Sequence, residues 1–143
     1  MNGENIKRVS DVMTSDFILI DGLATISEAV QQMKTAGASC MIVRKRHEDD
    51  EYGILLMSDI AKHVIARDRS PDRVNVYEIM AKPVIFVRPN MDVRYTARMF
   101  DRFGLSMAPV LKSGEVLGIV SYDDIVLGSA DSAPPALPPP EDS

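Results

Sequence analysis

The chain has little of several features that mark particular classes of protein. It contains one cysteine, Cys40, and no tryptophan. A single cysteine excludes an intramolecular disulfide, and with only two scattered histidines it provides no metal-ligand spacing. No apolar run approaches the ~18 residues of a transmembrane helix, and residues 1–10 are too polar for a signal peptide. We therefore expect a cytoplasmic protein without a metal site and without a membrane partner.

Positive charge is also scarce. The 16 Lys and Arg residues are outnumbered by 21 Asp and Glu residues, which gives a formal net charge of -5. Nucleic-acid binding requires a basic face, so we expect no nucleic-acid partner. Hydrophobic residues make up 45% of the chain and aromatic residues only 6%. The sequence therefore has enough apolar material for a core, and that core must be mainly aliphatic.

The sequence contains an internal duplication, centred on two similar turns. Gly118-Ile119-Val120-Ser121-Tyr122-Asp123-Asp124-Ile125 matches Gly53-Ile54-Leu55-Leu56-Met57-Ser58-Asp59-Ile60 at an offset of 65 residues. Earlier in each half the offset is 67, as between Met13 and Met80. The first repeat therefore carries two extra residues in residues 46–52, where a surface hairpin tolerates insertion.

Both halves predict the same order of elements. In the first half we expect a short helix at 9–13, strands at 17–20, 39–43 and 53–56, and helices at 25–37 and 58–65. In the second we expect a short helix at 76–80, strands at 84–87, 106–111 and 116–120, and helices at 92–104 and 121–128. Thr25 and Asp92 are the expected N-caps, and Gly37 and Gly104 the expected C-terminal residues. The stripe of the 92–104 helix is Val93, Ala97, Phe100 and Phe103.

Composition divides the chain further. We expect a lead-in at 1–8, a first repeat at 9–67, a linker at 68–75, a second repeat at 76–128 and a proline-rich tail at 129–143. The tail lacks apolar periodicity, so we expect it to be disordered, although proline-rich segments also serve as docking peptides.

A strand, helix, strand, strand, helix repeat with a Gly-Ile-Val-Ser-x-x-Asp-Ile turn resembles the cystathionine-β-synthase (CBS) domain, and two in tandem resemble the CBS pair, or Bateman module. Asp11-Val12-Met13-Thr14 and 104–110 are similar to further patterns of that family. The resemblance implies an α/β (α+β) fold of two pseudo-symmetric β-α-β-β-α repeats packed through their sheets. It also implies a non-catalytic regulatory module that binds an adenosine-containing ligand (AMP, ADP, ATP or S-adenosylmethionine) in clefts between the repeats.

The resemblance implies one stronger and one weaker cleft. In the stronger, Asp124 takes the ribose hydroxyls and Ser121 lies near the phosphate. The wall of this cleft is formed by Ile18, Ile20, Ala38, Ser39, Cys40 and Met41. In the weaker cleft, Asp59 takes the ribose position, but Leu56 replaces the hydroxyl residue. The wall of that second cleft is formed by Val87, Arg88, Met107 and Pro109.

Other readings of the same residues stay open. Ser121 and Asp124 also fit a plain capping box, and the two roles are compatible. We interpret Arg94, Arg98 and Arg102 as a solvated helix face, the run 47–51 as a solvated loop and Cys40 as a small core residue. No nucleophile is paired with a base, so we expect no enzyme and no required cofactor. A ligand-free dimerisation module is the alternative function, and in either case we expect a homodimer and an unidentified protein effector.

Overall fold

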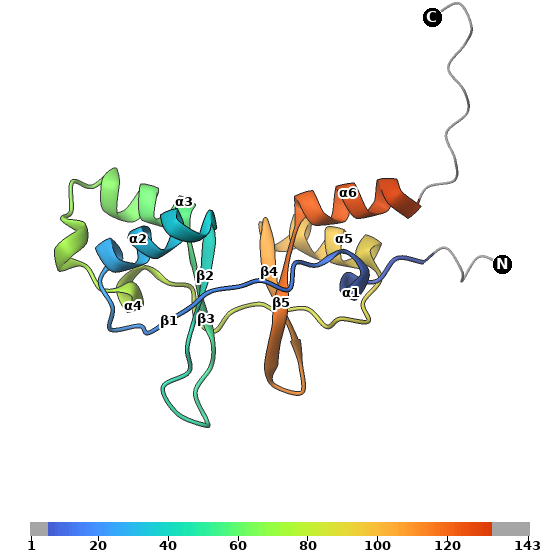
Figure 1. The fold of residues 1–143 in the computed structure, drawn as a ribbon, viewed down its shortest axis with the longest axis horizontal. Coiled ribbons are helices and arrows are strands. Elements are labelled where there is room, and N and C mark those ends of the chain that lie inside the picture. The colour runs from blue at the N-terminus through green and yellow to red at the C-terminus, as the bar shows by residue number, and fades with distance from the viewer. Residues whose placement is uncertain (1–5, 133–143) are drawn as a thin grey trace, which may run out of the picture. The chain divides into compact units, whose positions relative to one another are not determined.

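The computed structural model describes residues 6–132, which form two compact units (Figure 1). The first-repeat unit contains residues 16–85, and the second-repeat unit contains residues 6–15 together with 86–132. The units differ from the sequence repeats by an exchange of lead-in segments. Helix α1 (Val9–Val12) packs in the second-repeat unit, and α4 (Val76–Ile79) packs in the first-repeat unit.

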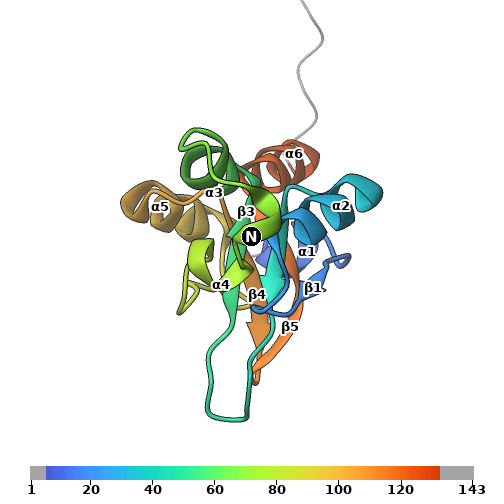
Figure 2. The same ribbon diagram turned by 90° about the vertical axis from the view of Figure 1, so that its left-hand side faces the viewer.

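The first-repeat unit is built on a three-stranded sheet in the order β1-β2-β3. Strand β1 (Leu19–Ile20) pairs parallel with β2 (Cys40–Val43), which pairs antiparallel with β3 (Gly53–Leu56). The unit's helices are α2 (Ile26–Ala36), α3 (Met57–Ile60) with a π-helical continuation (Ala61–Ile65), a 3-10 turn (Pro71–Arg73) and α4. The connection between β2 and β3 extends as a long hairpin at the end of these strands that faces away from α2 and α3 (Figure 2).

Helix α2 begins and ends where the sequence predicts. The Thr25 hydroxyl accepts a hydrogen bond from the Glu28 backbone N–H at 3.1 Å, which satisfies one of the free donors of the first turn. Gly37 ends the helix in the left-handed conformation with φ 66°, which costs glycine no steric strain. The buried stripe Ile26, Ala29 and Met33 lies in a core formed with β1, β2, β3, α3 and α4.

The second-repeat unit repeats this plan with a two-stranded sheet. Strand β4 (Met107–Lys112) pairs antiparallel with β5 (Glu115–Ser121), and a register shift separates Val110 from Leu111. Ser113 and Gly114, both at positive φ, make the tight turn between them. Helices α5 (Val93–Phe103) and α6 (Tyr122–Ser132) complete the unit, and its core includes Val9, Phe100 and Val120.

The two lead-in helices are attached by equivalent hydrogen bonds. Val9 N–H donates to Met91 O in one unit, and Val76 N–H donates to Ala24 O in the other, both at 2.8 Å. The two donors are 67 residues apart (76 minus 9), and so are the two acceptors (91 minus 24). The duplication inferred from the sequence is therefore present in the backbone.

Several expected elements are wrong in extent. The strand expected at 17–20 is reduced to Leu19–Ile20, and residues 84–87 form no strand. There, Val87 makes a single parallel bridge to Val110, because the run is short and lies between Pro83 and Pro89, which cannot donate ladder hydrogen bonds. The helix expected at 58–65 begins one residue earlier, at Met57, and Leu56 is its N-cap.

Two further expectations are corrected at helix faces and ends. Phe103 is 57% exposed, whereas Thr96 is fully buried, so the stripe of α5 is Val93, Thr96 and Phe100 with Ala97 half-buried. Helix α6 extends through Ser132, so the tail expected from residue 129 begins too early. The rest of that tail, 133–143, lies outside the described residues.

Candidate functional site

The turn between β5 and α6 carries the best-defined polar pair predicted for ligand binding. Ser121 is the last residue of β5, and Asp124 is the third residue of α6. Ser121 N–H donates to Asp124 Oδ2 at 3.0 Å, and Asp124 N–H donates to Ser121 Oγ at 3.2 Å. This reciprocal pairing is a capping box, so the structural interpretation of the two residues is confirmed.

The capping box leaves part of each side chain available. Among residues 6–132, Asp124 Oδ1 has no hydrogen-bond partner, and the Ser121 hydroxyl acts only as an acceptor. Both residues are half-buried. A carboxylate oxygen and a hydroxyl at a helix N-terminus are chemically suited to a diol and an anion.

The matching turn of the first repeat has the same backbone and different side chains. Met57 N–H donates to Ser39 O at 2.9 Å, just as Tyr122 N–H donates to Ser106 O at 3.1 Å. Leu56 at the N-cap provides no side-chain hydrogen bond, so Asp59 has no capping partner there. The two turns are equivalent in backbone and unequal in the polar groups that they present.

The predicted wall residues of the stronger cleft all lie in the first-repeat unit, whereas Ser121 and Asp124 lie in the second-repeat unit. Met41 is fully buried and Ile20 is 4% exposed, and both side chains belong to the core of the first-repeat unit. Ser39 is exposed, and Ile18, Ala38 and Cys40 are half-buried. Only these last four residues therefore present surface to a small molecule.

The predicted wall of the weaker cleft lies in the second-repeat unit and divides in the same way. Val87 and Pro109 are buried, whereas Arg88 is exposed and Met107 half-buried. Because successive side chains of an extended segment alternate between its two sides, a run of neighbouring residues cannot all line one wall. This alternation separates buried Val87 from exposed Arg88, whereas Pro109 is buried because β4 is buried continuously from Ala108 to Leu111.

Cys40 lies at the start of β2. Burial raises the pKa of its thiol to about 11, so the thiol is protonated at neutral pH. A protonated thiol is a weak nucleophile and a weak metal ligand. The interpretation of Cys40 as a small core residue is not confirmed, because the residue is half-buried and lies outside the core cluster of its unit.

The acidic run 47–51 is not simply a solvated loop, and for Asp50 that interpretation is wrong. Only 8% of the Asp50 side chain is exposed, and its carboxylate contacts Lys82 Nζ at 2.7 Å and Arg46 Nε at 3.3 Å. The hydrogen bond from Lys82, followed by the Arg46 backbone N–H, holds the Asp50 pKa well below its usual value. Sequence reasoning missed this pair because Asp50 and Lys82 are 32 residues apart.

Arginines on α5 occupy the solvated face that the sequence predicts. Arg94, Arg98 and Arg102 are exposed. Arg94 Nη2 contacts the N-cap carboxylate of Asp92 at 2.7 Å, and this hydrogen bond is the main reason for the lowered pKa of Asp92. The Arg94 guanidinium is thus paired with a carboxylate at the start of α5.

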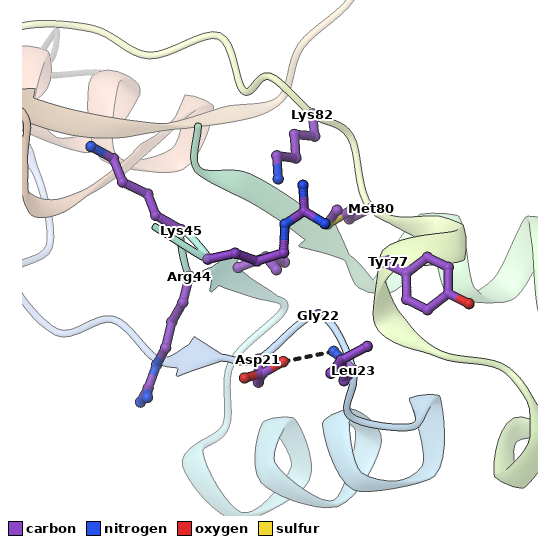
Figure 3. A pocket seen from close by; sticks show the side chains of 10 residues that line it. Asp21, Gly22, Leu23, Arg44, Lys45, Tyr77, Met80 and Lys82 are labelled. Carbon is purple, nitrogen blue, oxygen red and sulfur yellow. Dashed lines mark hydrogen bonds between the residues drawn. The ribbon is translucent and has the colours of Figure 1, made fainter. Parts of the chain in front are cut away.

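The first-repeat unit also contains a pocket of about 690 Å³ that sequence reasoning did not identify (Figure 3). It is lined by Asp21, Gly22, Leu23, Val43, Arg44, Lys45, Arg46, Tyr77, Met80 and Lys82.

The described part of the chain has no cluster of three or more His, Cys, Asp or Glu residues arranged for a metal. Nor does any helix within residues 6–132 combine the length and apolarity needed to cross a membrane.

Comparisons with known proteins agree with this architecture. The CBS domain family model matches residues 9–66 and 76–130. The hexameric CBS-CP12 protein from bloom-forming cyanobacteria is 40% identical with a TM-score of 0.85, over 87% of this chain and 72% of that one. The CBS domain pair of MJ0100, solved with 5′-methylthioadenosine and S-adenosyl-L-methionine, has the same fold at 24% identity and a TM-score of 0.76, over 90% and 99% of the two chains.

Longer proteins contain a similar segment. The L-aspartate semialdehyde sulfurtransferase of Methanosarcina acetivorans is 30% identical over 118 residues, which are 82% of this chain and 23% of the sulfurtransferase. The chain spans between 23% and 59% of the lengths of the curated relatives that it matches.

Proposed function

The chain belongs to the CBS-domain family, with two domains in tandem, and from this premise we propose that it is a non-catalytic cytoplasmic sensor of an adenosine-containing ligand. The ligand binds in the cleft that contains Ser121 and Asp124. The observation that carries the proposal is the Oδ1 atom of Asp124, which accepts no hydrogen bond from residues 6–132, beside the Ser121 hydroxyl at the N-terminus of α6.

The chemistry of this turn suits an adenosine ligand. Asp124 Oδ1 accepts hydrogen bonds from the two ribose hydroxyls, and the helix N-terminus with the Ser121 hydroxyl favours an anionic phosphate. In this proposal Ile18, Ala38, Ser39 and Cys40 provide the surface against the base. The ligands bound to the MJ0100 pair make 5′-methylthioadenosine and S-adenosyl-L-methionine two compounds to test beside AMP, ADP and ATP.

The second cleft, at Asp59, binds a phosphorylated ligand more weakly. Leu56 supplies no hydroxyl to the phosphate, and an anion that loses water without gaining a hydrogen bond is destabilised. We therefore propose one dominant nucleotide per chain, held at Asp124.

The proposal includes a homodimer that transmits the ligand signal to a protein effector. The second-repeat unit exposes large apolar side chains on α5 and α6, among them Phe103, Val126 and Leu127. Apolar helix faces of this kind are commonly buried by association. A ligand that binds one dimer arrangement more tightly than another shifts the population between them, and an effector responds to that shift.

A ligand-free dimerisation module is the competing function, and one observation favours it. Ser121 and Asp124 already satisfy each other's backbone N–H groups, so the turn is complete without a ligand. In that case both turns are only helix caps, and the apolar helix faces carry the function.

A thermal-shift screen separates the two functions. A ligand that binds only the native state raises Tm by mass action. We expect a rise with at least one of AMP, ADP, ATP, S-adenosylmethionine and 5′-methylthioadenosine, and a smaller rise with the 2′-deoxy analogue, which lacks one of the hydroxyls assigned to Asp124. If none of these compounds raises Tm, the turns are structural and the dimerisation module is the better account.

A further inference from the structure

The pocket of the first-repeat unit has features that the fold does not require. All ten lining residues lie between Asp21 and Lys82, so the pocket belongs to one unit. Its volume of about 690 Å³ falls within the range of roughly 300–1,000 Å³ that is typical of small-molecule sites. None of its residues belongs to the candidate adenosine site.

One side of the pocket is cationic. Lys82 projects toward the pocket (Figure 3), and its ammonium is held at 2.7 Å by the nearly buried Asp50 carboxylate. The backbone on both sides of Lys82 is fixed by β3 and its hairpin, because Ala81 exchanges two hydrogen bonds with Ile54 and Val84 N–H donates to Tyr52 O at 3.1 Å. Lys82 is therefore positioned before any ligand arrives, which lowers the entropic cost of binding.

The local charge differs from that of the whole chain. Four lining residues are basic, Arg44, Lys45, Arg46 and Lys82, and one is acidic, Asp21. The lining residues and Asp50 together carry a formal charge of four minus two, or +2, in a chain whose net charge is -5; Glu48, Asp49 and Glu51 of the adjacent hairpin are not among the lining residues. Within residues 6–132, Arg44 has no carboxylate partner, and Lys45 lies over the Tyr52 ring at 5.2 Å. Such a region attracts anions by electrostatics.

The other side of the pocket is apolar and aromatic. Leu23 is 73% exposed and Tyr77 is 52% exposed, so both present apolar surface. Tyr77 is fixed beside the Asp21–Leu23 turn, because its N–H donates to Gly22 O at 2.9 Å and Leu23 N–H donates to Asp21 Oδ1 at 2.8 Å. Val43 and Met80 line the same pocket. A ligand with an apolar or planar body would cover these side chains.

The second-repeat unit supplies an internal comparison. At the offset of 67 residues, Val43, Lys45 and Met80 correspond to the similar residues Val110, Lys112 and Met13. In contrast, Arg44, Tyr77 and Lys82 correspond to Leu111, Ser10 and Ser15. The same backbone plan is thus built without these three side chains, so the fold does not need them. Their presence together in the first-repeat unit points to a ligand.

We propose that this pocket binds a small organic anion, with a phosphate or carboxylate group at Lys82 and Arg46 and an apolar or aromatic body against Tyr77 and Leu23. The Asp50 carboxylate is a positioning group that holds both cations. Arg44 and Lys45, on flexible side chains at the rim, add long-range attraction. The site is independent of the adenosine ligand, because it shares no residue with the Ser121–Asp124 turn.

Titration of the ¹⁵N-labelled full chain with phenyl phosphate, followed by amide chemical shifts, tests the proposal. Inorganic phosphate and benzyl alcohol are parallel probes that carry only the anion or only the aromatic ring. We expect saturable shifts for phenyl phosphate at residues 21–23, 43–46 and 77–82. The affinity for each of the other two probes should be lower by about tenfold or more, because each probe lacks one half of the contacts.

Variants separate the pocket from general charge effects. Lys82→Gln should weaken the binding of phenyl phosphate about tenfold or more. Tyr77→Ser, which introduces the residue found at the equivalent position Ser10 of the second-repeat unit, should remove the advantage over inorganic phosphate. Lys82→Arg keeps the charge and should keep most of the binding. Lys112→Gln, the same change of charge at an exposed lysine of the second-repeat unit, should leave the affinity unchanged. A carboxylate analogue, benzoate, distinguishes a phosphate site from a general anion site.

Three results would overturn the proposal. The first is the absence of saturable shifts at the pocket with either phenyl phosphate or benzoate. The second is equal affinity for all probes, which would mean that anion and ring are not recognised together. The third is an equal loss of affinity in Lys112→Gln and Lys82→Gln, which would mean that only overall charge matters.

Discussion

Replacing Gly118 by alanine should destabilise the chain, because β5 passes unusually close to the segment after α1. An added Cβ at Gly118 would lie 2.2 Å from the Thr14 carbonyl oxygen, far inside the 3.0 Å that real Cβ atoms essentially never cross. The neighbour is backbone, so no side-chain rotation relieves the contact. Thr14 and Ile119 exchange two hydrogen bonds at 2.9 Å at this point.

The magnitude follows from the two ways in which the chain can respond. If the segments keep their positions, the overpacking costs about 1–3 kcal/mol. If they separate, two hydrogen bonds are lost at about 0.5–1.5 kcal/mol each, which is the same total. At roughly 2–4 °C per kcal/mol for a chain of this size, Tm should fall by roughly 2–12 °C.

Urea denaturation followed by far-UV circular dichroism measures this effect as a shift in midpoint at constant m value. Gly22→Ala is the matched control, because its added Cβ would meet Tyr77 and Val43 at 3.5 and 3.6 Å, ordinary contact distances. Both changes restrict the unfolded chain equally, so their difference reports the folded state. Equal midpoints for the two variants would refute the close approach of β5 and the Thr14 segment.

Three further predictions concern titration, thiol reactivity and assembly. The Asp50 pKa is lowered in the folded state. The stability that ionised Asp50 contributes is therefore complete above the unfolded pKa of about 4 and is lost as the pH falls below it. The difference in Tm between wild type and Asp50→Asn should shrink in acid, and a constant difference would contradict the ion pair. Cys40, whose pKa is raised to about 11, should react with iodoacetamide far more slowly in the native than in the urea-unfolded chain near pH 8, and equal rates would contradict its burial. Light scattering at micromolar concentration should give twice the chain mass, and Leu127→Glu should lower it; a monomeric wild type would remove the homodimer.

The sequence predicted the plan of the fold because periodicity and capping are local signals. The two N-caps accept backbone hydrogen bonds through their side chains, and the two C-terminal glycines adopt the left-handed conformation. The N-caps are Thr25 and Asp92, and the glycines are Gly37 and Gly104. The repeat pattern also gave the duplication correctly. The strand expected at 84–87 was wrong, since β propensity does not show whether a partner strand is available.

Features that depend on distant parts of the chain were beyond sequence reasoning. The exchange of α1 and α4 between the units, the ion pair of Asp50 with Lys82 and the pocket at Tyr77 each join residues that are far apart in sequence. For the candidate site, the polar pair Ser121 and Asp124 followed from local spacing. The wall residues did not, because burial of Ile20 and Met41 is decided by the core of their unit.

Calorimetric titration of the wild type, Asp124→Ala and Asp59→Ala with AMP and ATP tests the proposed function most directly. The account predicts one dominant site in the wild type, a loss of about tenfold to a hundredfold in affinity for Asp124→Ala, and near-wild-type binding for Asp59→Ala. Asp124→Ala removes Oδ1 and the capping box together, so its Tm should be measured in parallel to confirm that it is folded at the titration temperature. Wild-type affinity in Asp124→Ala, with the binding heat abolished in Asp59→Ala, would contradict the account.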